Sequence, residues 1–175
     1  QVELIKRFGA TVLVGFSDYL LRLAEVVREQ GLDPARDLKV RMIIGHLPEG
    51  GRTKLEEAWG GVPAFNWYGV ADTGILSTEG PERDGLYIWE DANFVEILDS
   101  ETHALTPRGE TGELVVTSLA KSDLAPLIRF NTHDLTALLP GQGKANLPFD
   151  RMAGLLGRSD NMVKLRGINI YPTAL

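Results

Sequence analysis

The sequence of 175 residues contains no cysteine, which excludes disulfide bridges and metal sites built on thiolates. It also lacks any apolar run near the ~20 residues that a membrane helix needs, and no signal sequence opens it. Basic residues are in the minority, with 18 Lys and Arg against 24 Asp and Glu and a formal net charge of -6. These absences predict a globular, cytoplasmic protein with no membrane and no nucleic acid among its partners.

The first part of the chain alternates between strand-like and helical patterns. Short apolar runs at residues 10–16, 38–46 and 62–69 are typical of buried parallel strands. Apolar residues at helical spacing occupy residues 17–31 and 51–59 between them. Strands separated by helices predict a parallel αβ sheet. Because the chain opens with Gln1 in an amphipathic stretch, we also expect it to be a segment of a longer protein.

After Gly80 the pattern changes to short β-rich runs separated by turn-forming residues, which predicts antiparallel strands. The fold class is therefore predicted as α/β: a parallel sheet with flanking helices, followed by a small antiparallel β-barrel-like subdomain. The polar segment 141–150 is predicted as a loop or linker, since it is rich in Gly, Pro and Asn. The segment that follows it looks like the opening hairpin of a further domain.

Polar side chains follow two of the predicted strands. Tyr68 and Asp72 lie where a parallel sheet ends at its carboxyl edge, which is the edge that binds ligands in open αβ sheets. Thr132, His133 and Asp134 stand together, and a carboxylate there can accept hydrogen bonds from both hydroxyls of a ribose. The alternatives are a tyrosine at the edge of the core, a solvated aspartate and a surface histidine.

Basic residues cluster near the end of the sequence. Arg158, Lys164 and Arg166 are suited to bind phosphates or a carboxylate, and the alternative is a solvated face. The histidines outside the 132–134 group are too scattered for any metal-ligand spacing.

In order, these pieces resemble the adenylate-forming superfamily, and most closely its phenylacetate-CoA ligase branch. WYGVAD resembles the YGxxE motif, and IRFNTHDLTALLPG resembles the aspartate motif usually written RYRTGD. GRSDNMVKLRGINIYPT is similar to the hinge and first hairpin of the C-terminal domain, and GLYIWED and GELVVTSL are similar to further segments of this branch. The resemblance covers essentially the whole chain, and the order of its motifs makes it specific.

The resemblance implies a division of the chain into four parts. These are residues 1–84 for the parallel αβ part of an AMP-binding domain, 85–140 for the antiparallel β subdomain, 141–160 for a linker and hinge, and 161–175 for the start of the C-terminal domain.

The resemblance also implies a role for each matching residue. Tyr68 would stack on adenine, and Gly69 would belong to the same nucleotide site. Asp72 stands where the family has glutamate, and it would act catalytically and help hold Mg²⁺. Asp134 would bind the two ribose hydroxyls, and Arg158 would reach the ribose or the phosphates.

The C-terminal motif implies roles in the second half of the reaction. Asp160 matches the hinge about which the small C-terminal domain rotates. Lys164, Arg166 and Gly167 fall on the hairpin that swings in, so they are assigned to CoA. The implied cofactors are ATP/AMP, Mg²⁺ and CoA.

The implied function is activation of a carboxylic acid with ATP to acyl-AMP and its transfer to CoA. An aryl or arylacetic acid is expected, with four aromatic residues either lining the acid pocket or serving as ordinary core residues: Phe16, Tyr19, Phe65 and Trp67. The turn 45–50, GHLPEG, replaces a GAEP-like turn, so His46 and Leu47 would reshape that pocket. Alternatives are a catalytically degenerate nucleotide-binding module, or an adenylating enzyme that loads a carrier protein or an amine. A homodimer is left open.

Two parts of the family's catalytic machinery are expected outside this sequence. The phosphate loop belongs upstream of Gln1, and the lysine of the adenylation step belongs beyond Leu175. Because preorganised charge around a phosphoryl transition state contributes several kcal/mol, the 175-residue chain alone is expected to be nearly inactive.

Overall fold

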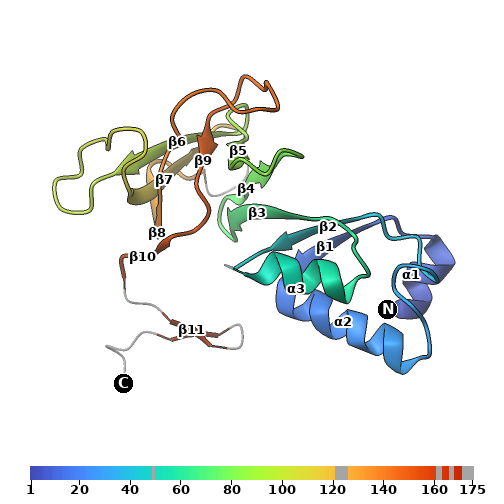
Figure 1. Ribbon diagram of the computed structural model, residues 1–175. Coiled ribbons are helices and arrows are strands. Elements are labelled where there is room, and N and C mark those ends of the chain that lie inside the picture. The colour runs from blue at the N-terminus through green and yellow to red at the C-terminus, as the bar shows by residue number, and fades with distance from the viewer. Residues whose placement is uncertain (49, 121–125, 161–162, 166–167, 171–175) are drawn as a thin grey trace. The chain divides into compact units, whose positions relative to one another are not determined.

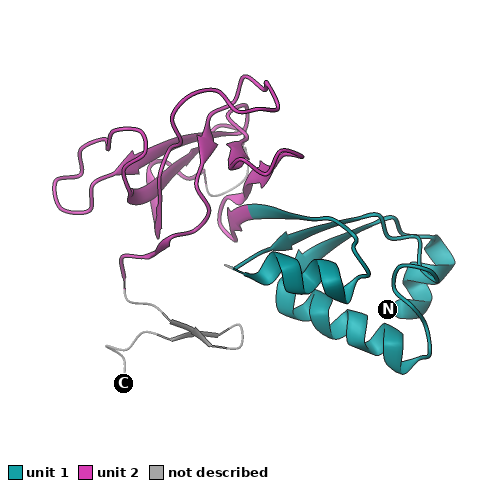
Figure 2. Cartoon of the chain, in the orientation of Figure 1, with its two compact units in different colours: residues 1–67 teal, residues 68–175 magenta. Residues whose placement is uncertain are grey.

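The computed structural model describes residues 1–48, 50–120, 126–160, 163–165 and 168–170. The chain forms two compact units, Gln1–Trp67 and Tyr68–Leu175 (Figure 2). Parallel strands with helices come first and antiparallel strands follow, so the predicted α/β fold class is confirmed. The predicted division at residues 84, 140 and 160 stays a prediction.

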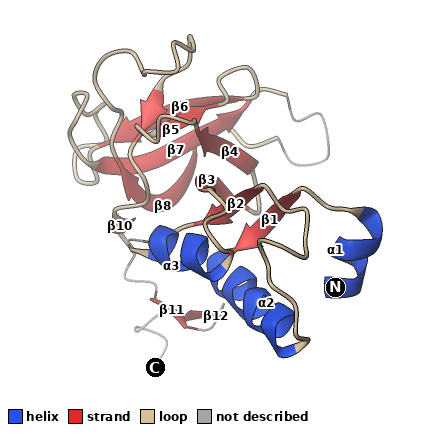
Figure 3. Ribbon diagram, turned by 45° about the vertical axis from the view of Figure 1, so that its right-hand side comes forward, coloured by secondary structure: helices blue, strands red, loops and turns tan. Residues whose placement is uncertain are grey.

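The first unit is a parallel sheet with helices α2 and α3 on one face (Figures 1 and 3). In chain order it contains α1 (Val2–Phe8), β1 (Val12–Phe16), α2 (Ser17–Glu29), β2 (Met42–His46), α3 (Gly51–Ala58) and the first residues of β3 (Ala64–Val70). Strands β1 and β3 each pair in parallel with β2. Phe16 is the register partner of His46, so the ends of β1 and β2 meet at one edge of the sheet.

The core of the first unit lies between the sheet and these helices. Trp59 is fully buried and its indole Nε1–H donates to the carbonyl of Leu20, 3.1 Å away, which joins α3's end to α2. The buried indole therefore satisfies its single donor while adding a large apolar surface to the core. None of the helices in the described ranges has the length and apolar character required to cross a bilayer.

The second unit is built from antiparallel strands. Its elements after β3 are β4 (Gly74–Glu79), β5 (Leu86–Ile88), β6 (Asn93–Leu98), β7 (Gly112–Ser118), β8 (Phe130–Thr136), β9 (Arg151–Met152), β10 (Gly157–Arg158), β11 (Val163–Leu165) and β12 (Ile168–Ile170). The strand orders are β4-β5-β9 and β10-β8-β7-β6, and β11 pairs with β12. A core of apolar side chains that includes Leu76, Ile97 and Leu114 lies within this unit.

A buried ion pair ties the polar segment 141–150 to the strands around it. Arg151 donates from Nη1 to Asp84 Oδ2 at 3.0 Å, and its side chain is only 9% exposed. Asp84 also accepts from the backbone N–H of Lys144 at 2.8 Å and from the hydroxyl of Tyr87 at 3.2 Å. The Lys144 N–H, with Arg151 and Tyr87 adding to it, holds the pKa of Asp84 below its ordinary value. The carboxylate thus fixes a segment that has no regular secondary structure.

At position 143 of this segment only glycine fits. A Cβ at this position would lie 2.1 Å from the hydroxyl oxygen of Tyr87 and 2.6 Å from Cδ of Arg151. Both atoms belong to the network around Asp84, so any larger residue would displace the network itself.

We predict that Arg151→Ala lowers the free energy of unfolding by about 1–3 kcal/mol, because the Asp84 side chain, which is only 13% exposed, would lose its charged partner. Urea denaturation measures the change. Arg129→Ala is the matched control: this guanidinium is 58% exposed and contacts Glu96, so its loss should cost only about 0–1 kcal/mol. Equal losses in the two variants would contradict the structural role of Arg151.

Candidate functional site

The candidate site is organised by an irregularity in strand β8. Glu113 pairs with Leu135 and Val115 pairs with Asn131, so Leu114 alone faces the three residues 132–134. The chain absorbs this surplus by placing His133 in the left-handed region, with φ of 59°. The side-chain oxygen of Asn131 accepts the backbone N–H of His133 at 2.8 Å, which stabilises the turn. Bulges of this kind redirect the side chains that follow them.

Asp134 follows the bulge and is the centre of the site. It is 5% exposed, and both of its carboxylate oxygens hold a partner. The hydroxyl of Tyr68 donates to Oδ2 at 2.5 Å, and Nη1 of Arg158 donates to Oδ1 at 2.5 Å. An ionised carboxylate has about four acceptor positions, so one further position remains on each oxygen. Two positions on adjacent oxygens match the two hydroxyls of a vicinal diol.

Arg158 is brought to Asp134 by strand pairing, since the two residues are register partners of β10 and β8. Its guanidinium also binds Asp160 through two bonds, from Nε to Oδ1 at 2.9 Å and from Nη2 to Oδ2 at 2.6 Å. The hydrogen bond to Asp160 is the main cause that raises the pKa of Arg158, and burial acts in the opposite direction. One fixed cation therefore links two carboxylates.

Tyr68 combines a buried ring with a buried hydroxyl. The residue is 4% exposed and packs in the core of the second unit. Burial is the main cause that raises the pKa of Tyr68, and the hydrogen bond to Asp134 raises it further. The phenol is therefore a permanent donor at neutral pH, and it holds Asp134 in one orientation. This contact was not anticipated from the sequence, which assigned Tyr68 to adenine stacking.

The other predicted residues of the YGxxE-like motif lie near the end of β3. Gly69 permits a close backbone approach, because a Cβ there would lie 2.3 Å from the carbonyl oxygen of Gly74. Asp72 is exposed in the turn between β3 and β4. Within the described ranges, no group of three or more His, Asp or Glu side chains could hold a metal ion.

The structure thus joins Tyr68, Asp134, Arg158 and Asp160 directly. Lys164 belongs to strand β11, where its register partner is Asn169 of β12. Arg166 and Gly167 lie outside the described residues. The roles assigned to all of these residues stay predictions.

Three rings gather at the carboxyl edge of the parallel sheet in the first unit. The ring centroids of Phe16 and Trp67 are 6.1 Å apart, and the ring of His46 lies 6.2 Å from Phe16 and 6.3 Å from Trp67. Phe16 is 58% exposed although it ends a strand of the sheet. An exposed aromatic group at a ligand-binding edge is suited to contact an apolar ring.

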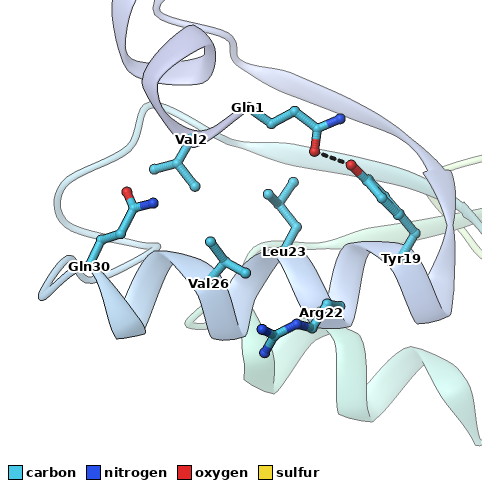
Figure 4. A pocket seen from close by; sticks show the side chains of 7 residues that line it. All are labelled: Gln1, Val2, Tyr19, Arg22, Leu23, Val26 and Gln30. Atoms are coloured by element: carbon cyan, nitrogen blue, oxygen red, sulfur yellow. Dashed lines mark hydrogen bonds between the residues drawn. The ribbon is translucent and has the colours of Figure 1, made fainter.

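A pocket of about 150 Å³ lies elsewhere in the first unit, between the start of the chain and α2 (Figure 4). Its lining residues are Gln1, Val2, Tyr19, Arg22, Leu23, Val26 and Gln30. Tyr19 donates to the side chain of Gln1, and Arg22 is paired with Glu25 and Glu29. Tyr19 therefore lies with this pocket, apart from the ring cluster at the sheet edge, and the pocket contains no residue assigned to the nucleotide.

The chain is similar to known proteins in sequence and in structure, although no protein-family model matches it. It is 39% identical over 181 residues to a phenylacetate-coenzyme A ligase of Pseudomonas putida. The aligned region covers 100% of this chain and 40% of that protein. The chain is similar over its whole length to phenylacetate-coenzyme A ligases. A phenylacetate-coenzyme A ligase of Aromatoleum evansii is 34% identical over 177 residues, covering 99% of this chain and 39% of that protein.

A solved structure supports the same relationship. A crystal structure of 2-hydroxyisobutyryl-CoA ligase, in complex with 2-HIB-AMP and CoA in the thioesterification state, matches with a TM-score of 0.87 at 26% identity. The match covers 98% of this chain and 37% of that one. The chain spans about 40% of the length of the phenylacetate-CoA ligases it matches.

We predict that the hydroxyl of Tyr68 makes the stability of this chain sensitive to alkali. Its raised pKa means that its contribution to stability is complete below about pH 10, the ordinary tyrosine value, and is lost as the pH rises further. Tyr68→Phe should lower the free energy of unfolding by about 1–3 kcal/mol at neutral pH, because Asp134 loses a donor. The difference from the wild type should shrink above pH 10.

Urea denaturation between pH 7 and pH 11 measures both effects. Tyr19→Phe is the control, because Tyr19 is 50% exposed. A constant difference between Tyr68→Phe and the wild type across this range would reject the proposed state of the phenol.

Proposed function

We propose that the protein containing this chain is an AMP-forming acid–thiol ligase that activates a carboxylic acid with ATP and transfers the acyl group to CoA. In the first step a carboxylate oxygen attacks the α-phosphorus of ATP, and pyrophosphate leaves. In the second step the CoA thiolate attacks the acyl carbon, and AMP leaves. The single observation that carries the proposal is the Asp134 carboxylate, held by Tyr68 and Arg158 with one acceptor position left on each oxygen.

In this proposal Asp134 binds the 2′- and 3′-hydroxyls of the ribose. Tyr68 and Arg158 fix the carboxylate before the nucleotide arrives, so little freedom is lost on binding. The guanidinium of Arg158 holds one oxygen of Asp134 by a charge-assisted hydrogen bond, which orients the carboxylate toward both hydroxyls. Gly69 lets the backbone at the end of β3 approach the strand beside it closely, and Tyr68 borders the adenine.

Magnesium would enter with the nucleotide. No group of three or more His, Asp or Glu side chains among the described residues could hold a metal ion by itself, and Mg²⁺ in ATP-dependent enzymes commonly takes one or two carboxylates and the substrate phosphates as ligands. The exposed Asp72 suits that arrangement, and Mg²⁺ bound there would neutralise charge on the phosphates.

The acid is proposed to be aryl or arylacetic. The cluster of Phe16, His46 and Trp67 at the carboxyl edge of the sheet supports this class, since an aromatic acid can contact ring faces and edges there. The names of the phenylacetate-coenzyme A ligases that match the chain point to the same chemistry.

CoA is proposed as the acceptor, with a carrier protein or an amine as the alternatives. The structural relative that contains 2-HIB-AMP and CoA supports this choice. Asp160 would be the hinge between the two half-reactions, since it stands two residues after the end of β10, the strand that pairs with the Asp134 strand. Lys164, Arg166 and Gly167 would then reach CoA from the following hairpin.

We predict that the full-length protein exchanges pyrophosphate into ATP in the presence of arylacetic or aryl acids, and more slowly with short aliphatic acids. A scan of acids in an ATP–pyrophosphate exchange assay measures the first half-reaction. Product analysis with CoA, a carrier protein or an amine identifies the acceptor. Absence of exchange with every acid would favour a nucleotide-binding module without turnover.

We predict that Asp134→Ala lowers kcat/KM for ATP by about 10–100-fold, because two hydrogen bonds to a charged acceptor are lost. The wild type should prefer ATP to 2′-deoxyATP, and the variant should lose that preference. Pyrophosphate exchange with the two nucleotides gives the ratio. A preference that survives in Asp134→Ala would remove this carboxylate from the ribose site.

A further inference from the structure

A second buried carboxylate, that of Glu113, lies close to the site without touching Asp134. Glu113 is 6% exposed although it is a carboxylate, and it is the second residue of the largely apolar strand β7. Its Oε2 accepts from the side-chain amide of Asn131 at 2.7 Å, and its Oε1 accepts from the hydroxyl of Ser159. The imidazole Nδ1 of His133 lies 3.7 Å from Oε1. Side chains from two separate segments, strand β8 and the residues after β10, therefore meet at one carboxylate.

The strand register places this cluster on the reverse face of the sheet. Glu113 pairs with Leu135, so the two side chains point to the same face. Asp134 pairs with Arg158 and precedes Leu135, so it points to the opposite face. The Asp134 carboxylate and the Glu113 carboxylate therefore lie on opposite faces of the sheet at the bulge of β8.

From the face of the sheet opposite Asp134, Glu113 stabilises the bulge of β8. Its partner Asn131 is the residue whose side-chain oxygen accepts the N–H of His133, the residue with positive φ. Because Asn131 donates to Glu113 with one end and accepts from His133 with the other, the carboxylate determines which way this amide faces. The orientation of the amide in turn fixes the backbone that leads directly into Asp134.

Glu113 also holds the chain that leads to Asp160. Ser159 stands between Arg158 and Asp160, and its backbone N–H donates to the carbonyl of His133 at 2.9 Å. Arg158 and Asp160 bind each other, while the Ser159 hydroxyl turns to Glu113. This hydroxyl is the main cause that holds the pKa of Glu113 below its ordinary value. Alternate residues of the segment are therefore clamped on alternate faces.

From this arrangement we infer that Glu113 is a positioning residue for nucleotide recognition: it fixes the bulge of β8 and the segment 158–160 from behind, so that Asp134 and Arg158 meet the ribose correctly. The inference rests on the proposed function, since it takes Asp134 as the ribose ligand. Glu113 itself touches no reacting group. Its effect is carried by Asn131 on one side and by Ser159 on the other.

The test uses the ATP to 2′-deoxyATP ratio of kcat/KM in the full-length protein, a quantity that simple loss of folded enzyme leaves unchanged. The wild type should prefer ATP by about tenfold or more. Glu113→Ala should reduce this preference to about threefold or less, because a small displacement of Asp134 weakens both hydroxyl contacts. Ser159→Ala, which removes only the hydroxyl, should reduce it by a smaller factor.

Two further variants serve as controls. Glu113→Gln keeps the shape, and its amide can accept from Asn131 and donate to the Ser159 oxygen, so it should restore most of the preference. Glu110→Ala removes an exposed carboxylate three positions earlier and should keep the wild-type ratio. If Glu113→Ala does not yield folded protein, Ser159→Ala and Glu113→Gln together carry the test.

The outcomes separate this inference from the proposed function. If Asp134→Ala abolishes the preference while Glu113→Ala and Ser159→Ala keep it, Glu113 has no positioning role and the ribose assignment stands. If Asp134→Ala keeps the preference, the ribose assignment itself is wrong. A reduced ratio in Glu113→Ala that Glu113→Gln restores supports the inference.

Discussion

The site depends on the burial of one negative charge. Asp134 is removed from water at the centre of the second unit, and an isolated carboxylate there would be strongly unfavourable. The hydroxyl of Tyr68 and the guanidinium of Arg158 replace the lost water, one at each oxygen. Each partner occupies only one of the two acceptor positions on the Asp134 oxygen that it contacts. The carboxylate is therefore stabilised in its buried position and can still bind a ligand.

The geometry that delivers this charge is itself unfavourable in isolation. A histidine in the left-handed region costs about 1–2 kcal/mol relative to an ordinary strand residue. The amide of Asn131 and the backbone of Ser159 both bind His133, and Glu113 binds the side chains of Asn131 and Ser159. Strain at a binding site persists when its surroundings determine it in this way. The strained residue stands directly before the carboxylate that the fold presents.

Much of the fold could be predicted because the patterns are local. The apolar runs that became β1 and β2, and the helical spacing that became α2, each depend on neighbours in sequence. The link between Asp134 and Arg158 could be expected only from the resemblance to a family. Glu113 was not singled out, although a carboxylate near the start of a largely apolar strand is a signal. Its partners come from β8 and from the segment after β10, and nothing in the local pattern indicates that pairing.

The same limit applies to the hydroxyl of Tyr68. Its motif suggested an aromatic face for a base, whereas the contact that the structure contains is made by the oxygen at the end of the ring. A residue type indicates which interactions are available, and three-dimensional packing decides which of them is formed. Arg151 and Asp84 illustrate this too, because 67 positions separate two residues that together fix a segment predicted simply as a linker.

The alternation of Arg158, Ser159 and Asp160 between the faces of the sheet makes chain length as important as chemistry at this point. Inserting or deleting one residue here would exchange the faces, so that the serine would meet Asp134 and the charged groups would meet Glu113. A substitution by a residue of similar shape keeps this alternation of faces. An insertion or deletion of one residue removes the contacts to Asp134 and to Glu113 together. The strand pleat therefore fixes how many residues can separate Arg158, which binds Asp134, from the proposed hinge residue Asp160.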